Sequence, residues 1–445
     1  MAARDEFSSK FGFVMAAAGS AVGLGNIWGF PTQVASNGGA AFVIVYLALT
    51  FVLAYPVLMA ELLVGRYAQS NSIDAYPKVT GYKKSVFLGV WGTLTVSAIL
   101  AFYSIVGGWL MAWMLHYCAK LIGLIGVAEW LIEFSLERNI IFAIVFSSVT
   151  LLIVKQGVAS GIERWSVRLM PSLLALMAIL IVYVGLQPGA AEGWSVFIVP
   201  DFGRVFDADL VIGAMGQAFF SLSLGVGTML IYGSYLSKRE NMVSIGAMVA
   251  LVDVGVAILA GALIIPAMYV AQASGVPIFD DAGNLISGDG LVFSVLPALF
   301  DSMHGLAALV PIGFFTLLIV AALTSSISML EVPVSYITER KNGDRARACY
   351  LVAGVILFTS LIILLNFDAL FGFVVSMSTE YSQPALGFFI CVVVGWFWNR
   401  NKLLDEIRLG NPEIATTLFW KVWPVYLQFV CPLIILLLFY RSFQA

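Results

Sequence analysis

One carboxylate, that of Asp253, stands alone in the apolar run MVALVDVGVAILAG. A charge deep in hydrocarbon is costly and by default marks a functional site. Two glycine-rich segments, GSAVGLGN (19–26) and SLSLGVGT (221–228), bring amide, hydroxyl and backbone oxygens into similarly apolar surroundings. Because oxygen ligands suit a hard cation such as sodium, we expect Asp253 to share an ion with both segments. The expected partners are Asn26, Ser221 and the carbonyl group of Ala21. A protonated Asp253 that carries a coupling proton is the alternative.

A second set of oxygens lies in the segment VAALTSSIS, which contains Ala321, Thr324 and Ser325. Neutral hydroxyl and carbonyl groups can coordinate sodium without placing a bare charge in lipid. We expect the two hydroxyls to meet opened backbone at Gly19 and Val22. In the alternative, each hydroxyl donates to the carbonyl four residues earlier in its own helix.

These residues belong to a chain whose composition suits lipid. Of the 445 residues, 61% are hydrophobic and 11% are charged, whereas roughly a quarter of a soluble chain is charged. Apolar runs of about 20 residues, enough to cross ~30 Å of hydrocarbon, recur along the sequence. The eleven predicted spans are 11–35, 40–69, 86–118, 139–155, 162–186, 209–236, 241–273, 307–340, 345–365, 367–398 and 416–440. We therefore predict an all-α polytopic membrane protein with a single membrane transport domain, 1–445.

Basic residues are unevenly distributed over the loops between these spans. Nineteen of the 23 lysines and arginines fall on the side of the N-terminus. Since positively charged loops stay in the cytoplasm, we predict a cytoplasmic N-terminus. The odd number of spans then places the C-terminus outside the cell, and the protein in the cell membrane.

Glycine interrupts the first and sixth spans at corresponding places. A glycine inside a helix costs about 1 kcal/mol, and irregular backbone at membrane depth is tolerated only where it lines a cavity. Such a pair of segments indicates an inverted repeat with the binding site between broken helices. The predicted halves are 1–186 and 209–398, followed by an additional helix, 416–440. Close packing of intact helices through small residues is the alternative.

The motifs RDEF, AGSAVGLGNIWGFP, ELLVGRY, GQAFFSLSLGVGT and AALTSSI, in this order, resemble those of the neurotransmitter:sodium symporters, especially the bacterial amino-acid members. The resemblance extends over nearly the whole chain. It implies an inverted five-plus-five repeat of the LeuT type with unwound helices 1 and 6. It also implies symport of an amino acid with two sodium ions by alternating access.

The resemblance carries the binding residues of the family onto positions of this sequence. The first sodium site falls on Ala21, Asn26, Ser221 and Asp253, together with the carboxylate of the substrate. The second falls on Gly19, Val22, Ala321, Thr324 and Ser325. The substrate site implied in this way comprises Ala21, Val22, Gly23, Gly25, Ile99, Tyr103, Phe220, Ser221, Ser223, Val226 and Met329.

Several positions define the expected substrate. Gly23 stands where the monoamine members have an aspartate, so the substrate should supply its own carboxylate. The apolar lining favours hydrophobic amino acids, aliphatic or aromatic. Asp253 replaces an asparagine common in the family, which suggests independence of chloride. Gly29 replaces the arginine of the outer ionic gate, so Phe30 and Tyr103 are the residues left to close the lid.

Other classes of protein find little support in the sequence. We find no nucleophile–base pair, metal cluster or phosphate-binding loop, so we do not expect an enzyme. Nothing indicates a nucleic-acid partner or an obligate protein partner, and the expected surroundings are the lipid bilayer. A non-transporting amino-acid sensor with the same binding residues is the remaining rival.

Overall fold

The computed structural model describes residues 5–279, 291–301, 308–340 and 344–442, and these residues are almost entirely helical. The predicted all-α class is therefore confirmed. In the first part of the chain the helices are α1 (Lys10–Ala21), α2 (Phe30–Ser36), α3 (Ala40–Leu49), α4 (Tyr55–Ala68), α5 (Ser72–Thr80), α6 (Val86–Leu121), α7 (Ile125–Ile132), α8 (Leu136–Val154), α9 (Arg164–Gly185) and α10 (Ala190–Ile198).

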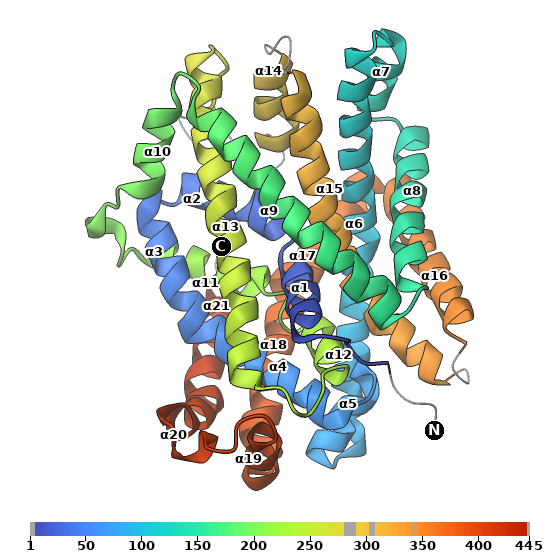
Figure 1. Cartoon of the computed structure of the whole chain (residues 1–445), viewed down its shortest axis with the longest axis vertical. Coiled ribbons are helices and arrows are strands. Elements are labelled where there is room, and N and C mark those ends of the chain that lie inside the picture. Colours follow the sequence, from blue (N-terminus) through green and yellow to red (C-terminus); the bar gives the residue numbers. More distant parts are fainter. Residues whose placement is uncertain (1–4, 280–290, 302–307, 341–343, 443–445) are drawn as a thin grey trace.

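The second part of the chain repeats this pattern of long helices and short connecting ones. Its helices are α11 (Ala208–Ser221), α12 (Thr228–Ser234), α13 (Met242–Ala273), α14 (Leu296–Asp301), α15 (Val310–Arg340), α16 (Arg345–Leu365), α17 (Phe367–Ser376), α18 (Gln383–Val392), α19 (Arg400–Arg408), α20 (Leu418–Val425) and α21 (Cys431–Ser442). In Figure 1, α7, α10 and α14 lie toward the upper end of the bundle, and α5, α19 and α20 lie at the lower end.

Among the described residues, eight helices are long and apolar enough to cross a membrane, or up to ten if each bent pair counts as one span. The sixth predicted span, 209–236, is not among them because it consists of two shorter helices, α11 and α12. The structure thus supports a multi-pass membrane protein with eight to ten candidate spans. The predicted number of eleven spans goes beyond this count.

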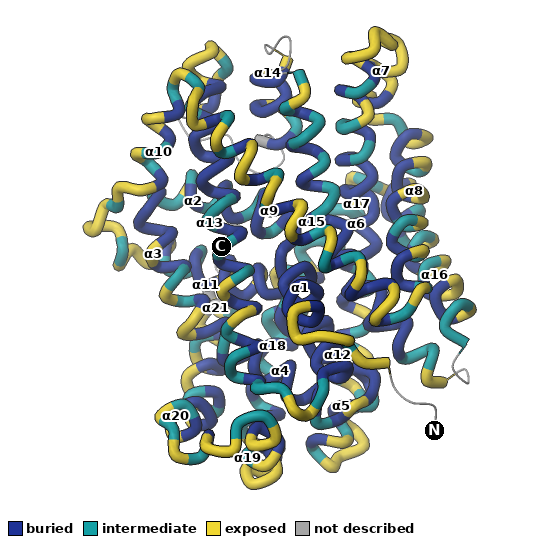
Figure 2. The backbone as a smooth tube through the Cα atoms, in the orientation of Figure 1, coloured by how far each residue is buried: buried dark blue, intermediate teal, exposed yellow. Residues whose placement is uncertain are grey.

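The break expected in the first span is present. α1 ends at Ala21, Val22 has an extended conformation, and a π-helical turn over Gly25–Gly29 leads into α2. The two parts of the span are bent by 57°. α1 is buried from Gly12 to Ala21, and Figure 2 shows it surrounded by other helices. The opened backbone therefore lies inside the bundle, where protein groups rather than lipid can satisfy it.

The sixth span is broken as well, between Ser221 and Thr228. Gly225 and Gly227 have φ angles of +87° and +82°, which glycine adopts without steric cost. Ser223 has φ +51°, an uncommon value for a residue with a Cβ atom. The carboxylate of Glu61, on α4, accepts a hydrogen bond from the Gly225 N–H and so fixes the loop. The two breaks meet where the Ser223 hydroxyl donates to the Ser20 carbonyl at 3.2 Å.

Candidate functional site

The carboxylate of Asp253 lies at the centre of a buried polar cluster. Asn26 Nδ2 donates to Asp253 Oδ1 at 2.8 Å, and Ser221 Oγ donates to Asp253 Oδ2 at 2.7 Å. The amide nitrogen of Asn26 also lies 2.8 Å from Ser221 Oγ. None of the three residues exposes more than 1% of its surface. The structure therefore brings together three predicted ligands that come from the breaks in spans 1 and 6 and from α13.

Tyr46, on α3, is a further polar member of this cluster that the sequence analysis missed. Its hydroxyl lies 3.2 Å from Ser221 Oγ, and the residue is completely buried. In the run AFVIVYLAL one tyrosine is indistinguishable from a core aromatic residue. Only the packing of α3 against α11 places its hydroxyl beside the break.

The chemistry of this cluster fits sodium. It offers carboxylate, amide and hydroxyl oxygens, which a hard cation prefers over nitrogen or sulfur. The Gly23 N–H donates to Asn26 Oδ1 at 3.3 Å, so the cluster extends to the opened backbone of span 1. No group of three or more histidine, cysteine, aspartate or glutamate residues that could hold a metal ion occurs in the part of the chain that the structure describes.

The second predicted set also meets the break in span 1, mainly through Ser325. The Ser325 hydroxyl lies 3.1 Å from the Val22 carbonyl oxygen and 3.4 Å from that of Gly19. The Thr324 hydroxyl instead donates within α15, to the Val320 carbonyl four residues earlier at 3.2 Å and to the Ala321 carbonyl at 3.0 Å. The Thr324 side chain is nonetheless close to span 1, since a Cβ atom built on Gly19 would lie 3.1 Å from Thr324 Cβ. The alternative of local hydrogen bonding thus describes Thr324 but not Ser325.

A cavity of about 320 Å³ opens beside the two breaks. Nine of the eleven residues predicted to bind substrate line it: Ala21, Gly23, Gly25, Ile99, Tyr103, Phe220, Ser223, Val226 and Met329. The other two lie behind the wall. Val22 is completely buried and offers its carbonyl to Ser325, and the Ser221 hydroxyl is bonded to Asp253.

The cavity continues past the break, away from the N-terminal end of span 1. Residues of this outer part that the sequence analysis did not assign include Trp28, Phe102, Val106, Trp109, Phe371 and Val375. Phe30, expected as part of a lid, is completely buried against Phe42 and Tyr46 instead. Aromatic residues at membrane depth carry no sequence signal that separates a cavity wall from a core, which is why the outer wall was missed.

Backbone and side chains of the cavity wall are closely fitted around the break in span 1. The Leu24 N–H donates to the Tyr103 hydroxyl at 3.2 Å, and Gln217 Nε2 donates to the Gly25 carbonyl at 2.9 Å. A Cβ atom added to Gly23 would lie 2.8 Å from Ser325 Oγ and 3.0 Å from the Tyr103 hydroxyl. Gln217 carried no signal in the sequence, because it is a lone amide in α11.

On the N-terminal side, the segment before α1 is fastened to the start of the fifth span. The Ser8 N–H and the Ser8 hydroxyl donate to the Glu163 carboxylate at 2.7 and 2.8 Å, and the Ser9 hydroxyl does so at 2.9 Å. Phe7 packs edge-on against Phe13 and Tyr232. These contacts hold the segment before α1 against the bundle on the side from which span 1 starts.

Comparison with known proteins gives matches over nearly the whole chain. Residues 4–124 and 131–445 match the model of the sodium:neurotransmitter symporter family. The chain is 34% identical to the uncharacterized sodium-dependent transporter YhdH of Bacillus subtilis (strain 168) over 98% of this chain and 96% of that protein. It is 25% identical to the sodium- and chloride-dependent taurine transporter of Rattus norvegicus over 91% of this chain and 73% of that protein.

Among solved structures, the chain resembles the crystal structure of MhsT in complex with L-phenylalanine. The TM-score is 0.84 at 34% sequence identity, and the match covers 99% of this chain and 100% of that one. The bundle with two broken helices is therefore the fold of MhsT, which bound phenylalanine in that crystal.

Proposed function

Because the chain belongs to the sodium:neurotransmitter symporter family, we propose that it is a sodium-coupled symporter of hydrophobic L-amino acids that works by alternating access. It is a transporter and not an enzyme. One observation carries the proposal. The two breaks present opened backbone to a buried, oxygen-lined polar cluster on one side and to an apolar cavity on the other. An ion and an organic substrate can therefore be held by the same peptide groups.

The proposed substrate follows from the cavity wall. Ile99, Phe220, Val226 and Met329 provide an apolar surface suited to an aliphatic or aromatic side chain. Gly23 supplies no carboxylate, so the wall offers no counter-charge at this position to an amine that lacks a carboxylate of its own. We assign to the Tyr103 hydroxyl, which accepts from the Leu24 N–H, the donor role toward the substrate carboxylate. The phenylalanine in the related MhsT crystal supports this choice of substrate.

We assign two sodium ions to the two sets of oxygens. The first would be held by Asn26, Ser221, Asp253 and the Ala21 carbonyl, with the carboxylate of the substrate. The second would be held by Gly19, Val22, Ala321, Thr324 and Ser325. Since ions and substrate then stabilise the same conformation of the breaks, each should bind more tightly when the other is present.

The buried carboxylate of Asp253 is the basis for proposing independence of chloride. Near the first ion it supplies a negative charge from the protein itself, and Ala257, one turn further along α13, is neutral and buried. Uptake should therefore be unchanged when gluconate replaces chloride. A loss of uptake in gluconate would refute this part of the proposal.

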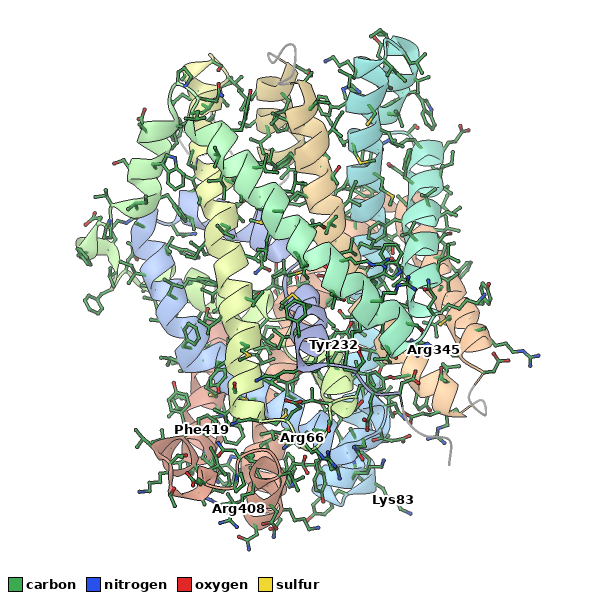
Figure 3. The ribbon with its side chains drawn as sticks, viewed as in Figure 1. Arg66, Lys83, Tyr232, Arg345, Arg408 and Phe419 are labelled. Carbon is green, nitrogen blue, oxygen red and sulfur yellow. The ribbon has the colours of Figure 1, made fainter. Side chains whose placement is uncertain are left out.

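The orientation in the membrane is proposed from charge. Figure 3 shows Arg66, Lys83 and Arg408 toward the lower end of the bundle. The positive-inside rule then assigns this end to the cytoplasm and the outer part of the cavity to the exterior. We propose eleven spans in one transport domain, with repeats over 1–186 and 209–398, helix 11 over 416–440 and the C-terminus outside.

The direct test is uptake of labelled L-phenylalanine into sealed proteoliposomes. We expect accumulation under an inward sodium gradient and none when potassium replaces sodium. Uptake that follows an imposed pH gradient without sodium would instead establish coupling to protons, with Asp253 as the protonated carrier. Sodium-dependent binding without accumulation would identify a sensor and refute transport. Competition by a panel of unlabelled amino acids defines the substrate range.

A further inference from the structure

A second hollow, separate from the substrate cavity, opens on the outside of the bundle. It has a volume of about 430 Å³ and lies between α6, α15 and α16, with α5 at one end. We call it the α6/α15/α16 groove. Its rim includes Leu94 of α6 and Val355 of α16, which are 65% and 58% exposed, and its floor includes Pro333 of α15 and Ile356 of α16, which are buried.

Besides the phenol of Tyr336, the groove contains three hydroxyls, and these offer no strong polar recognition. Those of Thr93, Ser97 and Thr359 each donate to the carbonyl four residues earlier in their own helix, at 2.7, 2.7 and 3.0 Å. Their hydrogens are thus used inside the helices. What remains is an apolar channel that faces the surroundings of the bundle, and in a membrane these surroundings are acyl chains.

The length of the groove corresponds to one leaflet. On α6 it extends from Val90 to Ala98, which at 1.5 Å per residue is about 12 Å. One leaflet contributes about half of a hydrocarbon layer of ~30 Å. The groove therefore has the length for a single acyl chain that enters from the N-terminal side of the bundle.

Each wall of the groove continues into a basic residue at that end. On α15, Arg340 follows the groove residue Tyr336 by one turn, and its guanidinium group lies 5.4 Å from the ring centre of Tyr336. On α16, Arg347 precedes the groove residue Leu351 by one turn, which places the two on the same face of the helix. On the α6 side, Lys83 lies in the short 3-10 turn before the helix, and Figure 3 shows it at the lower end of the molecule, well below Arg345 at the start of α16.

Acidic residues neutralise this rim only in part. Asp74 lies 3.5 Å from Arg340, and Asp344 lies 2.8 Å from Arg347. Both pairs are exposed, with 61% and 84% of the arginine side chains accessible, and ion pairs of this kind are weak. A ligand phosphate can therefore compete for the two guanidinium groups.

We propose that the α6/α15/α16 groove is a binding site for an anionic phospholipid, with one acyl chain in the groove and the phosphate beside Arg340 and Arg347. Apolar contact alone gives little preference within a bilayer, because lipid is equally apolar elsewhere. Selectivity must therefore come from headgroup charge. A second copy of this chain fits the groove poorly, since it would bring the same basic rim to the contact.

Native mass spectrometry of the purified full chain, given equal amounts of phosphatidylglycerol and phosphatidylcholine, tests the proposal. We expect the wild type to retain one phosphatidylglycerol in preference to phosphatidylcholine. Each cation near a membrane surface contributes a factor of about five in affinity for anionic lipid, so Arg340→Gln and Arg347→Gln should each reduce the preference about fivefold. Lys421→Gln, an exposed residue that does not line the groove, is the control.

Filling the groove with a bulky side chain should prevent phospholipid binding whatever the headgroup. Leu94→Trp and Val355→Trp are expected to lose most of the retained phosphatidylglycerol, whereas Ile179→Trp, at a site on α9 that is 64% exposed, should retain it. All three sites lie on the surface, and equal melting temperatures without added lipid would show that the variants are folded. The proposal is wrong if both groove variants retain lipid like the wild type, if the wild type does not prefer phosphatidylglycerol, or if the groove variants abolish a dimer instead.

Discussion

Replacing Gly23 by alanine tests whether the break in the first span holds the substrate. The residue lies in the cavity wall between the two predicted ion sites, and its N–H donates to Asn26 Oδ1 at 3.3 Å. A Cβ atom would lie 2.8 Å from Ser325 Oγ and 3.0 Å from the Tyr103 hydroxyl. Non-bonded contacts under 3.0 Å are essentially never made by real Cβ atoms, so either Ser325 or the opened backbone must move.

The loss of affinity for L-phenylalanine can be estimated from the packing around Gly23. Inserting one methyl group into a close-packed region costs typically about 1–3 kcal/mol. If this cost falls on the bound conformation, the affinity for L-phenylalanine should fall about 5- to 150-fold, since 1.4 kcal/mol is a factor of ten. Movement of the Ser325 hydroxyl, now 3.1 Å from the Val22 carbonyl oxygen, should also raise the sodium concentration needed for half-maximal binding.

The assay is equilibrium binding of labelled L-phenylalanine to the purified protein over a series of sodium concentrations. Gly216→Ala is the matched control, because it makes the same change in α11 at a position where a Cβ atom would meet nothing within 4 Å. Melting temperatures of both variants separate a loss of binding from a loss of folding. If Gly23→Ala binds phenylalanine within twofold of the wild type, the reasoning about this break is wrong.

Three further substitutions test other parts of the site. Asp253→Ala removes the carboxylate to which Asn26 and Ser221 donate, so sodium-stimulated phenylalanine binding should disappear. Binding that is still stimulated by sodium would count against the first ion site. Tyr103→Phe removes the proposed hydrogen bond to the substrate carboxylate, and a hydrogen bond to a charged group is worth about 1.5–3 kcal/mol. Phenylalanine binding should therefore weaken at least tenfold in a competition assay. An unchanged inhibition curve would contradict this role of Tyr103. Val226→Phe narrows the cavity and should shift the ratio of valine to phenylalanine uptake about tenfold toward valine; an unchanged ratio would place the substrate side chain elsewhere.

The broken helices could be predicted because glycine weakens a helix, and a weakened helix at membrane depth is tolerated only where it lines a cavity. A run such as SLSLGVGT in an apolar span leaves few options besides a break that lines a cavity, and the positive φ angles of Gly225 and Gly227 lie at this run. The left-handed conformation of Ser223 was not predictable, since it depends on the hydrogen bond that its hydroxyl makes to the Ser20 carbonyl. The same break divides the sixth span into two helices that are each too short to count as a span.

Side-chain roles that depend on packing between helices were harder to predict. Tyr46 and Gln217 are single polar residues in apolar helices, and no spacing within their own segments relates them to Ser221 or Gly25. The position of Phe30 was mispredicted for the same reason, since which aromatic residues face the cavity depends on how the helices are rotated. Composition predicts that these side chains are in the membrane, but only three-dimensional packing decides which of them form the wall.

The proposed coupling between ions and substrate has a simple structural basis in three consecutive residues of the first span. The Val22 carbonyl accepts from Ser325 in the second ion set, the Gly23 N–H donates to Asn26 in the first ion set, and the Leu24 N–H donates to Tyr103 in the cavity wall. Rotation of one of these peptide units necessarily moves its neighbours, because planar peptide groups leave only two soft dihedral angles per residue. The three sites therefore cannot rearrange independently. Since coupling free energies are reciprocal, the factor by which sodium raises the affinity for the amino acid must equal the factor by which the amino acid raises the affinity for sodium.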